Sequence, residues 1–198
     1  AKEAAVYAGY LSKLGVHKQQ ANRLLEPFVY YHGVMTSTEW DNFWRLRVHP
    51  DAQPEFQELA SIMRELYETN KPVSRKYHLP YADDLDIPLG DAFKVSAARC
   101  ARVSYKTFDG TLSTVDKDRQ LCEDLIAAGH LSPFDHPATS DTTTQFDVSR
   151  TMDDPALLKR YWDHPDDHRH FWGWIPQRVD IEKEKGWLGR RNSYAPLP

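Results

Sequence analysis

The stretch TSTEWDNFWRLRVHPDAQPE, residues 36–55, has the residue spacing of an amphipathic helix. Trp40, Phe43 and Trp44 stand three and four positions apart, which places their side chains on one helical face. This pattern predicts a helix that buries an aromatic stripe.

Arg47 continues the aromatic face seven positions after Trp40. A buried cation needs an anionic partner, because an unpaired one is strongly destabilising. Two partners fit the sequence. One is a salt bridge to Asp51 or Glu55, and the other is an anionic ligand such as a phosphate, which Arg binds bidentately.

Further helices are expected on both sides of this stretch. Thr36 and Glu39 form a possible capping box that would begin the central helix. Gly15 is a plausible end for the first helix, and Pro27 would kink or end the second. The expected flanking helices cover residues 2–14, 17–31 and 54–70.

The second half of the chain mixes helical and extended patterns. Residues 71–92 lack a helical period and are expected to be a connection. FKVSAARCARVSY, residues 93–105, is expected to be a strand or extended segment, and the Thr-rich residues 138–148 a strand. Residues 113–130 are expected to be a helix, with Ser113 and Asp116 as its capping box. We therefore expect one domain with a helical half, residues 1–70, and an α/β half, residues 93–198.

Composition and charge exclude several classes of protein. The 198 residues are 40% hydrophobic and 27% charged, which is typical of a globular domain. The formal net charge of −4 gives no general attraction to nucleic acid or to an anionic membrane. No apolar run approaches the roughly 18 residues of a membrane span. We expect a cytoplasmic protein with no nucleic-acid or membrane partner.

The sequence offers no metal or nucleophile signature. Cys100 and Cys122 do not have metal-ligand or redox spacing and are expected to be free thiols. The stretch DHPDDHRHF, residues 163–171, is rich in His and Asp but matches no specific metal motif. No nucleophile elbow is present, so covalent and hydrolytic catalysis lack support. We expect no bound metal.

Three polar constellations could instead bind a ligand. Arg23 flanks an apolar stripe and is either a solvated helix residue or a ligand contact. Arg99 and Arg102 would face opposite sides of a strand, but in a turn they could converge on a phosphate. The turn GHLSPFDHPA, residues 129–138, offers hydroxyl, imidazole and backbone groups to a polar ligand.

Taken together, four stretches resemble the motifs of the flavin-dependent thymidylate synthases. AARCARVSY and GHLSPFDHPA resemble that family's Ala-Arg-Val-Ser segment and its Gly-His-x-(Ser/Thr)-Pro-Phe-Glu-His turn. GVHKQQANRLLEPF and TEWDNFWRLRVHPDAQPE resemble its Ala-Arg-x-x-x-Pro helix and its Asn-x-x-x-Leu-Arg-x-x-x-His-Ala-Gln helix. The second pair precedes the first, as in a circularly permuted, phage-associated branch. The resemblance covers about residues 5–70 and 93–140.

The resemblance implies a fold and an activity. The fold would be α+β, with long helices packed on a small, mostly antiparallel sheet. The protein would be a homotetramer with active sites shared between subunits. It would methylate dUMP to dTMP with FAD, methylene-tetrahydrofolate and NADPH. The cofactor would carry the chemistry and the protein would orient the uracil, so no catalytic residue is assigned.

The resemblance also assigns binding residues. Arg23 and Arg47 would bind the substrate nucleotide near its phosphate, with Arg47 also contacting the flavin. The residues that would bind FAD are Asn42, Arg47, Ser104, His130 and Ser132.

Two departures from the family pattern define alternatives. Asp51 stands where the His-Ala-Gln histidine would be, and the signature Arg-His-Arg-x-x-Ser-x-Asn-Glu-x-Ser-x-Arg-Tyr does not occur in the 198 residues. An upstream segment or another polypeptide could supply that signature, and we expect these residues alone to synthesise no thymidylate. The alternatives are a non-catalytic nucleotide- or flavin-binding or assembly subunit, and a phage enzyme that modifies another pyrimidine.

Overall fold

The computed structural model describes residues 1–103, 113–142 and 162–188. Its contacts divide the chain into two compact units, Ala1–Gly33 and Val34–Pro198. The division falls within residues 1–70, which the sequence treats as a single helical half. We describe each unit by itself.

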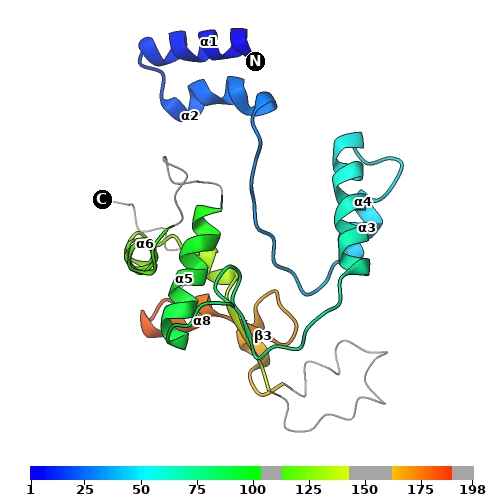
Figure 1. The fold of residues 1–198 in the computed structure, drawn as a ribbon, viewed down its shortest axis with the longest axis vertical. Coiled ribbons are helices and arrows are strands. Elements are labelled where there is room, and N and C mark those ends of the chain that lie inside the picture. The colour runs from blue at the N-terminus through cyan, green and yellow to red at the C-terminus, as the bar shows by residue number, and fades with distance from the viewer. Residues whose placement is uncertain (104–112, 143–161, 189–198) are drawn as a thin grey trace. The chain divides into compact units, whose positions relative to one another are not determined.

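The first unit consists of helical segments arranged side by side (Figure 1). Gly15 has a φ of +82°, a conformation that Gly adopts easily, and it ends the first helix as expected. The helix expected over residues 17–31 is shorter than predicted and becomes a 3-10 helix, because Pro27 cannot continue an α-helix. The segments are α1 (Lys2–Lys13), α2 (Lys18–Ala21) and η1 (Asn22–Phe28).

In the second unit, α3 (Asp41–Arg47) and α4 (Pro54–Thr69) form a helical pair (Figure 1). The expected start of α4 at Pro54 is confirmed, with the proline at the first helical position. The expected capping box of α3 is wrong. Glu39 N–H donates to Ser37 Oγ over 3.2 Å, and the hydroxyl of Thr36 is hydrogen-bonded to a distant residue instead.

The aromatic face of α3 forms as the sequence predicts. Trp40 stacks on Trp44 with ring centroids 5.2 Å apart, and Phe43 meets both rings edge-on. Trp44 is buried, and its ring lies 5.9 Å from that of Tyr67 on α4. The stripe therefore joins α3 to α4.

The segment expected to be extended, residues 93–105, is wrongly predicted. It belongs to α5 (Leu89–Arg102) up to residue 102, and residues 104–112 lie outside the described part. A strand would bury alternate residues, whereas Ala92, Val95 and Ser96 are all buried at positions i, i+3 and i+4, which is helical spacing. Because the buried residues of this helix are mostly small, its helical period is not visible in the pattern of large apolar side chains.

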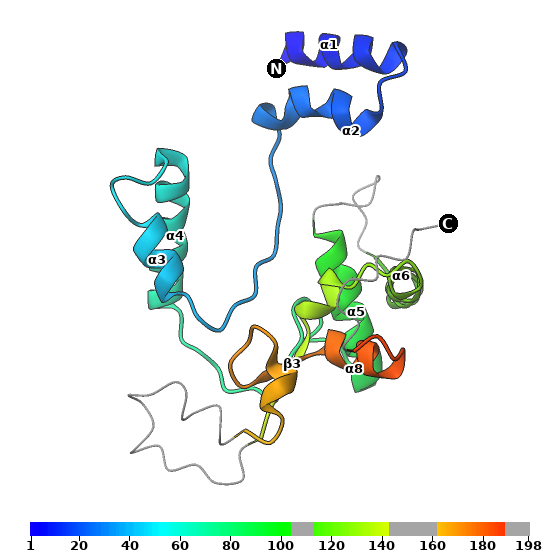
Figure 2. The same cartoon turned by 180° about the vertical axis from the view of Figure 1, so that it is seen from behind.

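Helix α6 (Val115–Ala127) is confirmed, but its cap differs from the expected one. Thr114 is the N-cap, and its side chain accepts a hydrogen bond from Lys117 N–H over 3.4 Å. Helices α5 and α6 pack against each other (Figure 2).

A small antiparallel sheet completes the α+β fold. Its strands, in spatial order, are β1 (Tyr77–His78), β2 (Ala138–Ser140) and β3 (Trp174–Pro176). Strand β2 confirms the first three residues of the expected Thr-rich strand, whereas residues 143–161 lie outside the described part. Strand β1 lies in the segment that the sequence treats only as a connection. Two residues give no local signal, and β1 exists because it pairs with β2.

The core joins elements that are distant in the sequence. One buried cluster contains Ala97 of α5, Cys122 of α6, Phe134 of η2 (Ser132–Asp135) and Ile181 of α8 (Gln177–Glu184). Helix α8 contacts β3, and Figure 2 shows these two elements side by side. No helix among the described residues is both long and apolar enough to cross a membrane.

Candidate functional site

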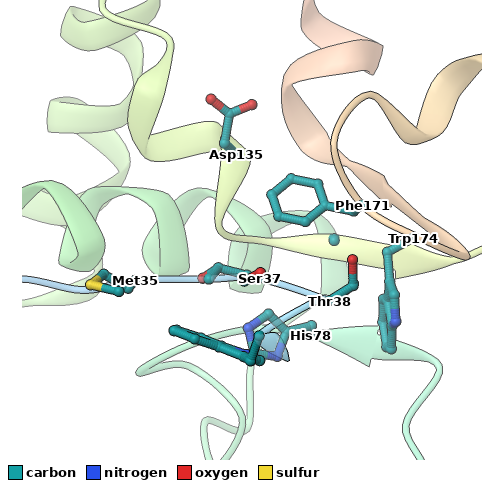
Figure 3. Close-up of a pocket in the computed structure, with 10 residues that line it drawn as sticks. Met35, Ser37, Thr38, His78, Asp135, Phe171 and Trp174 are labelled. Atoms are coloured by element: carbon teal, nitrogen blue, oxygen red, sulfur yellow. The ribbon is translucent and has the colours of Figure 1, made fainter. Parts of the chain in front are cut away.

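A pocket with a volume of about 250 Å³ lies between the extended residues 35–40 and the sheet (Figure 3). His78 of β1 and Trp174 of β3 line it, as does Phe171 from the loop before β3. Their rings give the pocket an aromatic wall. The sequence assigns a ligand role to none of these three residues.

Two hydrogen bonds hold residues 35–40 in place. The hydroxyl of Thr36 and Nδ1 of His136 lie 2.9 Å apart, and Thr38 Oγ1 accepts from Trp172 N–H over 2.9 Å. The first bond joins the segment before α3 to the GHLSPFDH turn, a separation of 100 residues. Thr38 of one motif stretch and Ala138 of another both line the pocket, so two of the motif stretches meet there.

The histidines beside the pocket are held neutral. Burial is the main cause that lowers the pKa of His78 and of His136 below the usual histidine value. The His78 ring meets the Trp174 ring edge-on, with centroids 6.2 Å apart. At neutral pH each imidazole can donate one hydrogen bond and accept one.

Asp135 lines the pocket, but its carboxylate does not point into it. Figure 3 shows this carboxylate directed away from His78 and Thr38. It accepts a hydrogen bond from Arg178 Nη1 over 3.0 Å, and Arg178 also donates to Glu182. Asp135 therefore fastens the turn to α8.

A buried carboxylate anchors the loop that carries Phe171. Asp141, at the end of β2, accepts from Thr142 N–H, from His164 N–H and Nδ1, and from His168 Nε2, over 2.8–3.1 Å. His168 in turn accepts from Gly173 N–H over 3.3 Å through Nδ1. The His- and Asp-rich stretch thus contributes to a structural network. No group of three or more His, Cys, Asp or Glu residues in the described part of the chain could hold a metal ion.

Arg47 does not lie where the sequence predicts. It is exposed, and its guanidinium carbon lies 6.0 Å from the Phe56 ring centroid. Within the described residues it forms no ion pair with Asp51 or Glu55. The expectation of a buried guanidinium is wrong, because Arg47 is the last residue of α3 and extends past the aromatic stripe. Its role in ligand binding stays a prediction.

None of the other residues assigned by resemblance that the structure describes lines the pocket. Asn42 is exposed and accepts a hydrogen bond from Arg45 over 2.9 Å. His130 and Ser132 are exposed on the turn, and Arg23 is exposed on η1 in the first unit. Ser104 lies outside the described residues. Neither Asn42, Arg47, His130 nor Ser132 lines the pocket.

Arg99 and Arg102 converge on an internal anion. Their Nε atoms lie 3.0 and 3.4 Å from the carboxylate of Asp118, which is fully buried on α6. Residues three apart lie on one face of a helix. An extended segment would place Arg99 and Arg102 on opposite sides, whereas in α5 both side chains reach Asp118. A phosphate is not needed to explain this pair.

The two cysteines are unsuited to nucleophilic chemistry. Both are free and buried. Burial raises the pKa of Cys100 to about 12 and that of Cys122 to about 11, so both are thiols at neutral pH.

This pocket is too small for a whole FAD. A volume of about 250 Å³ is below the roughly 300–1,000 Å³ of pockets for drug-sized ligands, so the pocket suits a single ring system. Comparisons of the chain with protein-family models, with curated proteins and with solved structures found no match.

Proposed function

We propose that the chain is a subunit of a flavin-dependent thymidylate synthase that methylates dUMP with methylene-tetrahydrofolate and NADPH. The pocket carries this proposal, because Thr38 of one motif stretch and Ala138 of another, on which the resemblance rests, both line it. The α+β fold with a small antiparallel sheet agrees with the fold that the resemblance implies. Such an enzyme would work in the cytoplasm.

The proposal requires assembly. Asn42, Arg47, His130 and Ser132 are exposed, and none of them lines the pocket described above. A homotetramer would complete each FAD site with residues from neighbouring copies. In that arrangement Arg23 and Arg47 would bind the nucleotide phosphate through charge-assisted hydrogen bonds.

Tritium release from labelled dUMP tests the activity. The chain is assayed with FAD, NADPH and methylene-tetrahydrofolate, alone and with a polypeptide that carries the His-Arg signature. Release with the added polypeptide supports the proposal, and product mass distinguishes dTMP from another modified pyrimidine. Binding of dUMP and FAD without turnover in either mixture would favour the non-catalytic subunit. Absence of both binding and turnover would contradict the proposal.

Arg47 gives a sharper test of the site. Substitution Arg47→Ala should weaken dUMP or FAD binding by about 1.5–3 kcal/mol, the range for a hydrogen bond to a charged group. Equilibrium dialysis measures the affinity. Arg64→Ala is the control, since Arg64 is a partly exposed arginine that pairs with Glu68 on α4. Equal affinity of the Arg47→Ala variant and the unmodified chain would exclude the proposed contact.

A further inference from the structure

The pocket beside the sheet has the walls of a ring-binding site. Trp40, Phe171 and Trp174 line it, and Met35 adds a flexible apolar side chain. Aromatic side chains attract flat rings by stacking and by edge-to-face contact. Trp174 is fixed by its place in β3 opposite Ser140 and by its edge-on contact with His78.

His78 is one of the polar side chains of the pocket that remain free to bind a ligand. The Ser37 hydroxyl donates to Glu39 O and accepts from Glu39 N–H, and the Thr36 hydroxyl is bound to His136. By contrast, neither ring nitrogen of half-buried His78 has a hydrogen-bond partner among the described residues. A half-buried imidazole with both nitrogens unused gains from a ligand that satisfies one of them.

The lining favours an uncharged ligand. Asp135 is the charged residue at the pocket, and its carboxylate is turned away toward Arg178 (Figure 3). An ion entering the pocket would lose hydration without gaining an opposite charge, which is costly. A phosphate on the ligand would therefore stay outside.

We infer that this pocket binds the flat, uncharged nitrogen heterocycle of a ligand, with the ring against the aromatic wall and His78 forming its hydrogen bond. The volume of about 250 Å³ suits one ring system. Uracil, pterin and flavin rings share this chemistry. The inference is independent of thymidylate synthesis, because ring binding requires no turnover.

Equilibrium dialysis of the full chain against uridine, 6-methylpterin and lumiflavin tests the inference. None of these probes carries a phosphate, so charge cannot account for binding. Saturable binding of at least one probe is expected, and the preferred probe identifies the type of ring. Substitution His78→Phe keeps a ring against Trp174 but removes both nitrogens, and it should raise Kd about three- to tenfold.

Two further variants separate the hydrogen bond from the fold. His78→Gln restores a donor and an acceptor and should recover part of the lost affinity. His49→Phe, at an exposed histidine after α3, should bind like the unmodified chain. Saturable binding of none of the three probes would overturn the inference, and so would unchanged affinity in His78→Phe. Ring binding without tritium release from dUMP, even with the polypeptide that carries the His-Arg signature, would leave the inference standing and count against the proposed function.

Discussion

At the scale of single residues, the buried carboxylate of Asp118 has the clearest energetic role. It faces the guanidinium groups of Arg99 and Arg102, which are both partly exposed. Substitution Asp118→Asn would leave two cations without their anion. We expect a loss of about 2–3 kcal/mol in the free energy of unfolding, below the 3–5 kcal/mol typical of a fully buried pair.

Urea unfolding measures this loss, and the same helix offers a matched control. Asp116 pairs with Arg119 over 2.8 Å, but its side chain is 89% exposed. Asp116→Asn should change the stability by less than about 0.5 kcal/mol. Similar losses of unfolding free energy in both variants would show that the burial of Asp118 does not strengthen its contribution to stability.

The carboxyl group of Asp141 should make the free energy of unfolding depend on pH. Burial alone would raise the pKa of its carboxyl, but hydrogen bonds from His164, His168 and Thr142 outweigh burial and hold the pKa below its usual value. A carboxyl with a lowered folded-state pKa stabilises the fold above its unfolded value of about 3.9, and this contribution is lost as the pH falls through the folded pKa.

We expect the stability difference between the Asp141→Asn variant and the unmodified chain to become smaller as the pH falls. At pH 6, Asp141→Asn should cost about 3 kcal/mol, because it removes a buried, hydrogen-bonded charge. Urea unfolding at pH 6 and pH 3 should show a smaller gap between variant and unmodified chain at pH 3. Asp166→Asn, at an exposed position on the loop that Asp141 anchors, should show little difference at either pH. A gap that does not change with pH would exclude the charged carboxylate as its cause.

At the scale of elements, the turn into β3 depends on Gly173. Its φ is +73°, and a Cβ built there would lie 2.7 Å from Trp162 Cη2. Gly173→Ala should cost about 2–4 kcal/mol, from backbone strain together with the displacement of a packed ring. Gly186→Ala has a similar φ of +64° with no atom nearby, so it should cost only about 1–2 kcal/mol. Equal losses of unfolding free energy in the two variants, measured by urea unfolding, would show that the Trp162 ring moves aside at no cost.

The sequence predicts those elements whose signals are local. Pro54 marks the start of α4, and the apolar period of α6 identifies that helix. Helix α5 was missed because small residues form its buried face, and β1 because it depends on its partner strand. The pocket could not be predicted either, since the bond between Thr36 and His136 spans 100 residues and no local pattern indicates it. The assigned ligand residues follow from the resemblance alone.

At the scale of the whole molecule, α4 carries an apolar stripe that predicts self-association. Phe56, Leu59, Ile62 and Leu66 recur at helical spacing, and each is at least half exposed. Exposed apolar surface of this kind favours burial against a partner. Because the proposed sites are completed by neighbouring copies, we expect a second copy of the chain to contact this stripe.

Substitution Leu59→Glu tests the stripe, since it places a charge in the middle of the expected interface. We expect it to raise the dissociation constant of the oligomer more than tenfold, which corresponds to about 1.4 kcal/mol or more. Sedimentation equilibrium over a range of concentrations measures the change. Ser61→Glu adds the same charge at an exposed position on the opposite side of α4 and should leave the association unchanged. If the unmodified chain sediments as a monomer at every concentration, the apolar stripe is not an interface between copies, and a tetrameric enzyme with shared sites is excluded for this chain.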